Sequence, residues 1–222
     1  MTDQPTRQHR ISIPKYTLAE ELINAISHGL GAVLGLVALI LCIVKSVAAA
    51  NVYGCVASIV FGVTVMLLYT VSCLYHALKV NRAKRVFRVL DHCTIFLLIA
   101  GTYTPYTLVS LRSTIGWWVF GIIWGAAVIG IVLNAISLKT FAKISVVLYL
   151  LMGWIIVVAY QSMLAAVPAG GMMLLVWGGV AYSLGAVLYA IGSRKPYFHS
   201  VFHVFCLIGT FLHFLSIYLY VL

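Results

Sequence analysis

Long apolar runs separated by short polar breaks dominate this sequence and restrict it to one class of fold. Of its 222 residues, 64% are hydrophobic and 8% are charged, whereas a soluble domain carries about 25% charged residues. Only helices and closed barrels can span a bilayer, and a barrel would show short alternating strands. The runs here are continuous. The sequence therefore predicts an all-α membrane protein and excludes a soluble enzyme or a secreted factor.

Windows of about 20 apolar residues, the length that crosses a bilayer as a helix, predict seven transmembrane helices. We place them at 20–46, 52–79, 87–110, 115–137, 142–163, 169–192 and 197–221. The connections between them are short, so residues 18–222 are expected to form one domain. Residues 1–17 are polar and are expected to form a cytoplasmic tail.

The positive charges are distributed unevenly between the two sides of these predicted helices. Of the 14 Lys and Arg residues, 12 lie in the tail and in the second, fourth and sixth connections, and only Lys45 and Arg112 lie on the other side. The positive-inside rule then places the N-terminus in the cytoplasm and the C-terminus outside. Short clusters of cations between apolar runs are typical of membrane loops, and we expect no nucleic-acid partner.

Ionisable residues within membrane helices are costly and are therefore candidates for function. In the predicted topology, His76 ends the second helix, Asp91 begins the third, and His199 and His203 begin the seventh, all at the cytoplasmic side. The i, i+4 spacing of His199 and His203 places both rings on one helix face, and Ser72 and His76 repeat it. Three imidazoles with a water or a carboxylate are typical of catalytic zinc, and iron, cobalt and nickel also accept such ligands.

Each of these residues also has a purely structural interpretation. Two interfacial histidines can cap a helix end, and His76 can be an ordinary interfacial residue. Asp91 can stabilise the start of its helix and pair with Arg88. Their joint placement at one membrane depth favours the metal site.

Three further histidines are not assigned to the site. His28 lies on the same side, where hydrogen-bonded packing is favoured over a role as fourth ligand. His92 points about 100° away from Asp91 on the helix. His213 lies about 21 Å deeper than His199, because an α-helix rises 1.5 Å per residue, and it cannot bind the same ion.

The polar residues also resemble the signature of a known family. Ser72-xxx-His76, Asp91 and His199-xxx-His203 are similar to the motifs of the progestin and adipoQ receptor family. The segments EELINAISHGLG, LDHCTIFLLIAGTYTPY, HSVFHVF and LHFLSIYLY resemble its bacterial branch, the haemolysin III proteins. The resemblance runs from about residue 17 to residue 221. It implies a seven-helix fold with the N-terminus inside, in a bacterial inner (plasma) membrane.

The resemblance also implies a chemistry. It implies a zinc ion held by His76, His199 and His203, with Asp91 and Ser72 beside the water that the zinc would activate. Relatives in the wider superfamily resemble ceramidases, which cleave lipid amides, and bacterial members are named for haemolysis and linked to membrane homeostasis. The expected function is therefore a zinc-dependent hydrolase of a lipid amide or ester, with a membrane lipid as substrate or ligand.

Two other functions remain open at this point. In a receptor-like or homeostasis regulator, the zinc would be structural and no turnover would occur; direct binding by Asp91 in a closed four-ligand site would favour this. A pore-forming or cytolytic protein would need a continuous polar path, and the outer halves of the predicted helices are poor in charge. The oligomeric state is also open, because Gly121 and Gly125 suit either internal packing or a dimer.

Overall fold

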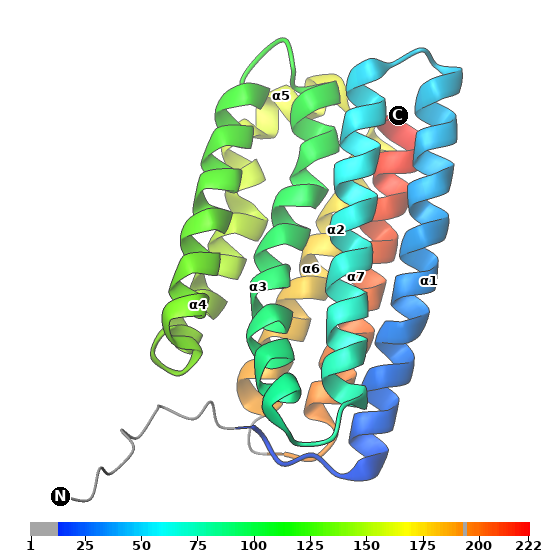
Figure 1. Ribbon diagram of the computed structural model, residues 1–222. Helices are drawn as coiled ribbons and strands as arrows, with labels where there is room; N and C mark the ends of the chain where they lie inside the picture. Colours follow the sequence, from blue (N-terminus) through cyan, green and yellow to red (C-terminus); the bar gives the residue numbers. More distant parts are fainter. Residues whose placement is uncertain (1–12, 193–194) are drawn as a thin grey trace, which may run out of the picture.

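The computed structural model describes residues 13–192 and 195–222, and every regular element within them is helical (Figure 1). The elements are α1 (Leu18–Ala48), α2 (Val52–Ala77), α3 (Arg82–Pro105), η1 (Tyr106–Ser110), α4 (Gly116–Trp154), η2 (Ile155–Ala159), α5 (Tyr160–Ala166), α6 (Ala169–Gly192) and α7 (Phe198–Tyr220). They form an elongated bundle in which the start of α1, the α2–α3 connection and the start of α7 share one end. Residues 1–12 of the predicted tail lie outside the described residues, and residues 13–17 precede α1 without helical structure.

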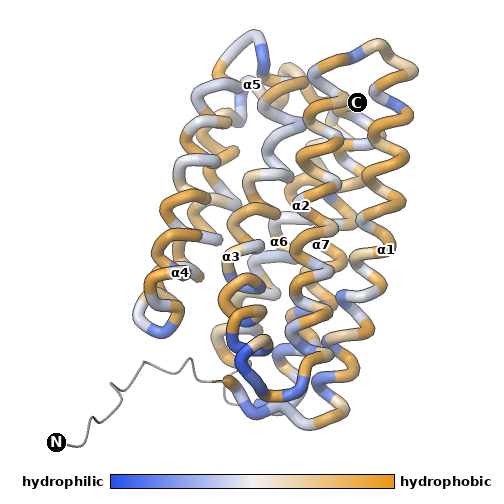
Figure 2. Tube along the Cα trace, viewed as in Figure 1, coloured by the Kyte–Doolittle hydropathy of each residue, from blue (hydrophilic) through white to orange (hydrophobic). Residues whose placement is uncertain are grey.

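Within the described residues, six helical stretches are long and apolar enough to cross a membrane. They are Leu18–Ala48, Val52–Ala77, Arg82–Ser110, Gly116–Ala166, Ala169–Ile191 and Phe198–Tyr220. Figure 2 shows hydrophobic residues along the length of the bundle and a concentration of hydrophilic residues at the end that carries the α2–α3 connection. These features confirm the prediction of an all-α, multi-pass membrane protein.

One of the six stretches is too long for a single crossing. Gly116–Ala166 has 51 residues, which a straight helix would extend over about 76 Å, whereas the hydrocarbon core is about 30 Å thick. Ser137 interrupts α4 with φ −160° and ψ 96°. Beyond it the chain folds back, because Ser145 Oγ donates a 2.6 Å hydrogen bond to Asn134 Oδ1. Figure 1 shows α4 as two neighbouring arms, which we call the first arm (116–136) and the second arm (138–154).

Side-chain caps determine where several helices begin. Thr17 and Glu20 form a capping box at the start of α1, which satisfies backbone donors that have no partner within the helix. Asn51 caps α2 through Gly54 N at 2.8 Å. Asn81 caps α3, so this helix begins at Arg82, about one turn before the predicted start at 87.

A stripe of small and polar residues on α1 faces the bundle. Its buried residues are Glu20, Asn24, His28, Gly31, Gly35, Ala38, Cys42 and Ser46. A Cβ atom at Gly31 would lie 2.7 Å from Tyr69 Cδ1 and 2.8 Å from Leu207 Cδ2. The missing side chain therefore lets α1 approach both α2 and α7 closely, and this approach brings His28 against His203.

Gly130 in the first arm of α4 provides a test of this packing. A Cβ there would lie 2.2 Å from Cζ of the fully buried Phe96, and overpacking a core costs about 1–3 kcal/mol. Gly130→Ala is therefore expected to lower the free energy of unfolding by that amount in a denaturant titration in detergent. Gly121→Ala is the matched control, because a Cβ at Gly121 meets no atom of the described residues within 4 Å. Equal stabilities of the two variants would contradict the packing described.

Candidate metal centre and adjoining cavity

Three buried histidines converge where the end of α2 meets the start of α7. His76 lies in the last turn of α2, and His199 and His203 lie in the first two turns of α7. His199 Nε2 is 3.4 Å from His76 Nε2 and 3.1 Å from His203 Nε2. One ring nitrogen from each residue lies within 4.8 Å of the other two. The structure thus brings together the three residues that the sequence predicted as metal ligands.

The spacing of these nitrogens fits a bound metal ion better than it fits hydrogen bonds alone. A ring nitrogen carries either one hydrogen or one lone pair in the ring plane, so His199 Nε2 cannot make good hydrogen bonds to both neighbours. Two imidazole nitrogens on a tetrahedral zinc at 2.0–2.1 Å are about 3.3 Å apart. The observed separations of 3.1 and 3.4 Å lie on either side of that value. The three histidines can therefore hold a metal ion, and the same spacing suits other divalent metals that accept imidazole.

Glu21 contacts the outer side of His76 and was not predicted as a site residue. Its Oε2 lies 2.7 Å from His76 Nδ1. Lys84 Nζ donates to Glu21 Oε1 at 2.6 Å and to the carbonyl of Leu78 at 3.0 Å. The signal in the sequence was the acidic pair at the start of an otherwise apolar helix, but Glu21 and His76 are 55 positions apart. Only the packing of α1 against α2 shows that they meet.

Two aromatic rings, one just before α1 and one on α1, stack on histidines of the cluster. Tyr16, which precedes α1, stacks on His199 with ring centroids 5.0 Å apart. Burial raises the pKa of the Tyr16 phenol well above its usual value, so the hydroxyl stays neutral. His28 stacks on His203 with centroids 3.6 Å apart. We predicted hydrogen-bonded packing for His28; the packing is present, but both of its ring nitrogens lack a hydrogen-bond partner among the described residues.

Asp91 and Ser72 lie beside the cluster and not among its converging nitrogens. Both line the same cavity as His203. Asp91 Oδ2 lies 3.9 Å from His92 Nδ1, and within the described part of the chain Asp91 forms no ion pair with Arg88. The structure therefore places the carboxylate and the hydroxyl where they can face a molecule in the cavity.

The structure gives the two remaining histidines different surroundings. His92 also lines the cavity, with Nδ1 2.9 Å from the Arg88 carbonyl and Nε2 3.1 Å from the Tyr189 hydroxyl. The sequence analysis assigned His92 no role, because the angular offset between His92 and Asp91 on the helix does not show that His92 lines a cavity. His213 Nε2 lies 3.1 Å from the Leu175 carbonyl, ten residues farther along α7 than His203. It is not one of the converging ligands.

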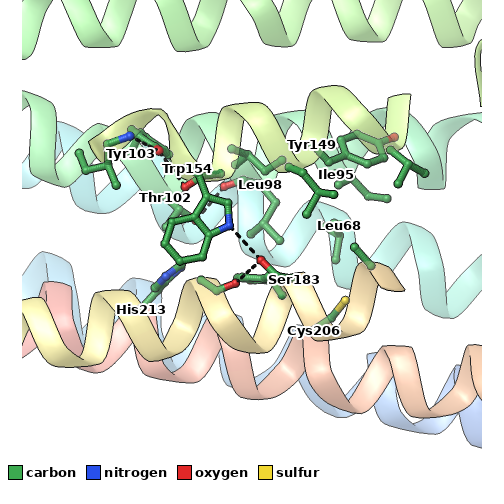
Figure 3. Close-up of a pocket in the computed structure, with 18 of the residues that line it drawn as sticks. Leu68, Ile95, Leu98, Thr102, Tyr103, Tyr149, Trp154, Ser183, Cys206 and His213 are labelled. Carbon is green, nitrogen blue, oxygen red and sulfur yellow. Dashed lines mark hydrogen bonds between the residues drawn. The ribbon is translucent and has the colours of Figure 1, made fainter. Parts of the chain in front are cut away.

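An apolar cavity of about 440 Å³ extends from the histidines into the bundle. It begins at Ser72, Asp91 and His203 and continues to Tyr106 and His213. Figure 3 shows part of its wall, in which Leu68, Ile95, Leu98, Tyr149 and Cys206 are labelled. A polar end with metal-ligating groups is thus joined to a long apolar space.

A single indole crosses the gap between two walls of this cavity. Trp154, at the end of the second arm of α4, donates a 2.9 Å hydrogen bond from Nε1 to Ser183 Oγ on α6 (Figure 3). Tyr103 fixes the chain on either side of Trp154, since its hydroxyl donates to the Gly153 carbonyl and accepts from Ile156 N, both at 3.0 Å. Side-chain hydrogen bonds therefore connect this end of the second arm to α3 and α6.

Comparison with known proteins agrees with the family that the sequence motifs indicated. The family model described as Haemolysin-III related matches residues 16–214. Hemolysin-3 of Bacillus cereus is 37% identical over 222 residues, covering 100% of this chain and 98% of that protein. The Hemolysin-3 homolog of Bacillus subtilis (strain 168) is 36% identical over 205 residues, covering 92% of this chain and 96% of that protein. This chain therefore belongs to the haemolysin III family of multi-pass bacterial membrane proteins.

Proposed function

We propose that this protein is a zinc-dependent hydrolase that cleaves an amide or ester bond of a membrane lipid and so contributes to membrane homeostasis. The observation that supports this most is the arrangement of the three histidines at the polar end of an apolar cavity, with Asp91 and Ser72 on the same wall. Zinc, when bound, lowers the pKa of a water toward 7 and polarises a carbonyl. An open position toward the cavity is what a catalytic zinc site needs.

The residues around the cluster have separate roles in this proposal. Asp91 accepts the proton of the attacking water and delivers it to the leaving nitrogen or oxygen as the carbonyl–heteroatom bond breaks. Ser72 donates a hydrogen bond to the carbonyl oxygen as that oxygen gains negative charge. Tyr16 stacks on His199 and His28 stacks on His203, and in this proposal both rings exclude bulk water from the polar end.

The walls of the cavity favour a lipid as the substrate. A volume of about 440 Å³ lies within the range of small-molecule sites, which are mostly apolar with a few placed polar groups. His203 and His213, near its two ends, are separated by about 15 Å along α7. An acyl chain fits the apolar length, and the scissile carbonyl then lies at the polar end.

We also propose seven crossings, with the N-terminus in the cytoplasm and the C-terminus outside. The two arms of α4 support two crossings within Gly116–Ala166. The cations at the start of α3 lie at the same end of the bundle as the end of α2 and the start of α7, which carry the histidines. Alkaline phosphatase, which folds only outside the cytoplasm, is expected to be active when fused after Leu222 and inactive when fused after Lys79. The opposite pattern of activities would overturn this orientation.

A second candidate is a regulator in which the metal is structural. The specific observation is that α2 and α7 have few direct contacts apart from the histidines and the 2.7 Å Tyr69–Thr210 hydrogen bond. A metal between His76 and His203 would then fasten two helices that pack mainly against other partners. In this case chelation lowers the unfolding temperature and no lipid is cleaved.

Metal content and lipid cleavage, measured together, test the two candidates. The protein is purified in detergent with a tag that lacks histidine, and its zinc is counted by mass spectrometry. An N-acyl sphingoid base and a matched lipid ester are then offered, and released fatty acid is measured. About one zinc per chain with chelator-sensitive release is expected. Zinc without turnover on either lipid favours the structural role, and folded protein with no metal overturns both.

A further inference from the structure

The buried contacts of Glu21 and Lys84 carry an inference about how the metal site is prepared. We propose that Glu21 and Lys84 form a positioning pair that fixes the hydrogen of His76 on Nδ1 and directs its Nε2 lone pair toward His199 and His203. This inference rests on the metal site of the proposed function but not on any turnover there. It assigns a role to two residues on α1 and α3 that do not themselves touch the ion.

The first step concerns the charge state of Glu21. Lys84 is only 2% exposed, and its ammonium donates to Glu21 Oε1 at 2.6 Å. A buried ammonium without a partner is strongly unfavourable, so Lys84 keeps the Glu21 carboxylate ionised and in place. The second contact of Lys84, to the Leu78 carbonyl at 3.0 Å, orients the ammonium.

The second step concerns the hydrogen on His76. An ionised carboxylate can only accept hydrogen bonds, and Glu21 Oε2 is 2.7 Å from His76 Nδ1. The hydrogen must therefore be on Nδ1. Asn24 Nδ2 also approaches Nδ1, at 3.4 Å, but the shorter contact to a charged acceptor is the stronger one. Nε2 then carries the lone pair, and it is this atom that lies 3.4 Å from His199 Nε2.

Glu21→Gln is expected to lower metal affinity by about 10–100-fold, the usual effect of losing the hydrogen-bond partner of a ligating histidine. The physical reason is that glutamine offers one acceptor oxygen to two donors, Lys84 Nζ and His76 Nδ1. The oxygen serves the ammonium, and the amide NH₂ then faces a ring N–H. His76 loses its fixed orientation as a result.

A double variant separates this role from a purely structural one. In Glu21→Gln/Lys84→Met, no ammonium competes for the glutamine oxygen, so this oxygen can accept from His76 Nδ1 and part of the affinity returns. Lys84→Met alone leaves the carboxylate on His76 but removes the contact that holds this carboxylate in place, so the metal affinity is expected to fall by less than in Glu21→Gln. If Glu21 and Lys84 only held the helices together, the metal affinity would instead fall further with each lost contact, and the double variant would bind more weakly than either single variant.

The matched control is Glu20→Gln, in the neighbouring carboxylate. Glu20 accepts from Thr17 and from Tyr197 N at 2.8 Å and has no histidine partner among the described residues. Its metal affinity is therefore expected to equal that of wild type. Thermal unfolding of the metal-free proteins shows whether each variant is folded.

Co²⁺ and Zn²⁺ titrations of purified, chelator-stripped protein against a competing chelator measure these affinities, and the visible absorption of Co²⁺ reports its coordination. Equal affinities for Glu21→Gln and Glu20→Gln would overturn the proposal, as would a double variant no better than Glu21→Gln. A wild type that binds neither ion would overturn both the pair and the metal centre. The expected pattern in a protein that cleaves no lipid would support the pair while refuting the hydrolase.

Discussion

Replacing His203 with alanine is expected to remove the metal and any hydrolytic activity together. His203 is 1% exposed and supplies one of three converging nitrogens. Its loss leaves two ligands. Loss of a ligand's hydrogen-bond partner lowers metal affinity by about 10–100-fold, and loss of the ligand itself is expected to lower it further. Mass spectrometry of the purified variant should then show almost no zinc, and fatty acid release should fall to background.

His213→Ala is the matched control for this prediction. His213 lies on the same helix and is also buried, but its Nε2 contacts the Leu175 carbonyl on α6. This variant is expected to keep the zinc content of wild type. Full zinc occupancy in His203→Ala would exclude the three-histidine site, and loss of zinc in both variants would indicate a general disturbance of α7.

Asp91→Asn is expected to keep the metal and to lower the hydrolysis rate by about 10²–10⁴-fold, the usual contribution of a general base or acid. Asparagine has nearly the same shape as aspartate but cannot accept the proton. The Asp91 carboxylate is not among the converging ligand atoms, so the ion should remain. Zinc content and fatty acid release are measured on one preparation, so that activity is expressed per bound zinc.

Two outcomes for Asp91→Asn would point away from the proposed mechanism. Loss of zinc together with activity would make Asp91 a fourth ligand, as in a closed structural site. Unchanged activity per zinc would remove Asp91 from the reaction and direct attention to His92, which lines the same cavity. The proposed role of Asp91 instead predicts that zinc is retained and that activity per zinc falls.

Much of the fold follows from the sequence. A segment that crosses the bilayer must match its thickness and must pair its backbone N–H and C=O groups internally, and few structures do both. The length of the apolar runs predicted the helices and the interruption between 137 and 142, where Ser137 breaks α4. The placement of His76, His199 and His203 at one depth followed from helix order alone. These inferences need no knowledge of how the helices are rotated.

The contacts that depend on helix rotation could not be predicted. The stripe of small and polar residues on α1 indicates which face of that helix is buried, but not which residue of a neighbouring helix it meets, so the contact between Glu21 and His76 became visible only in the packed structure. The close approach at Gly31 fixes that rotation. The cavity was also unpredicted, because it depends on the distance between the second arm of α4 and α6, which Trp154 crosses.

The sparse contact between the second arm of α4 and α6 has a mechanical consequence. The proposed ligands are on α2 and α7, and α2 and α7 are each packed along much of their length against α1 or α6. The second arm and α5 meet α6 through few contacts. Lipids with acyl chains of different length could therefore be accommodated by small displacements of the second arm and α5. The three histidines would keep their relative positions. Hydrogen exchange should accordingly be fastest in residues 138–166 among the helical segments that enclose the cavity.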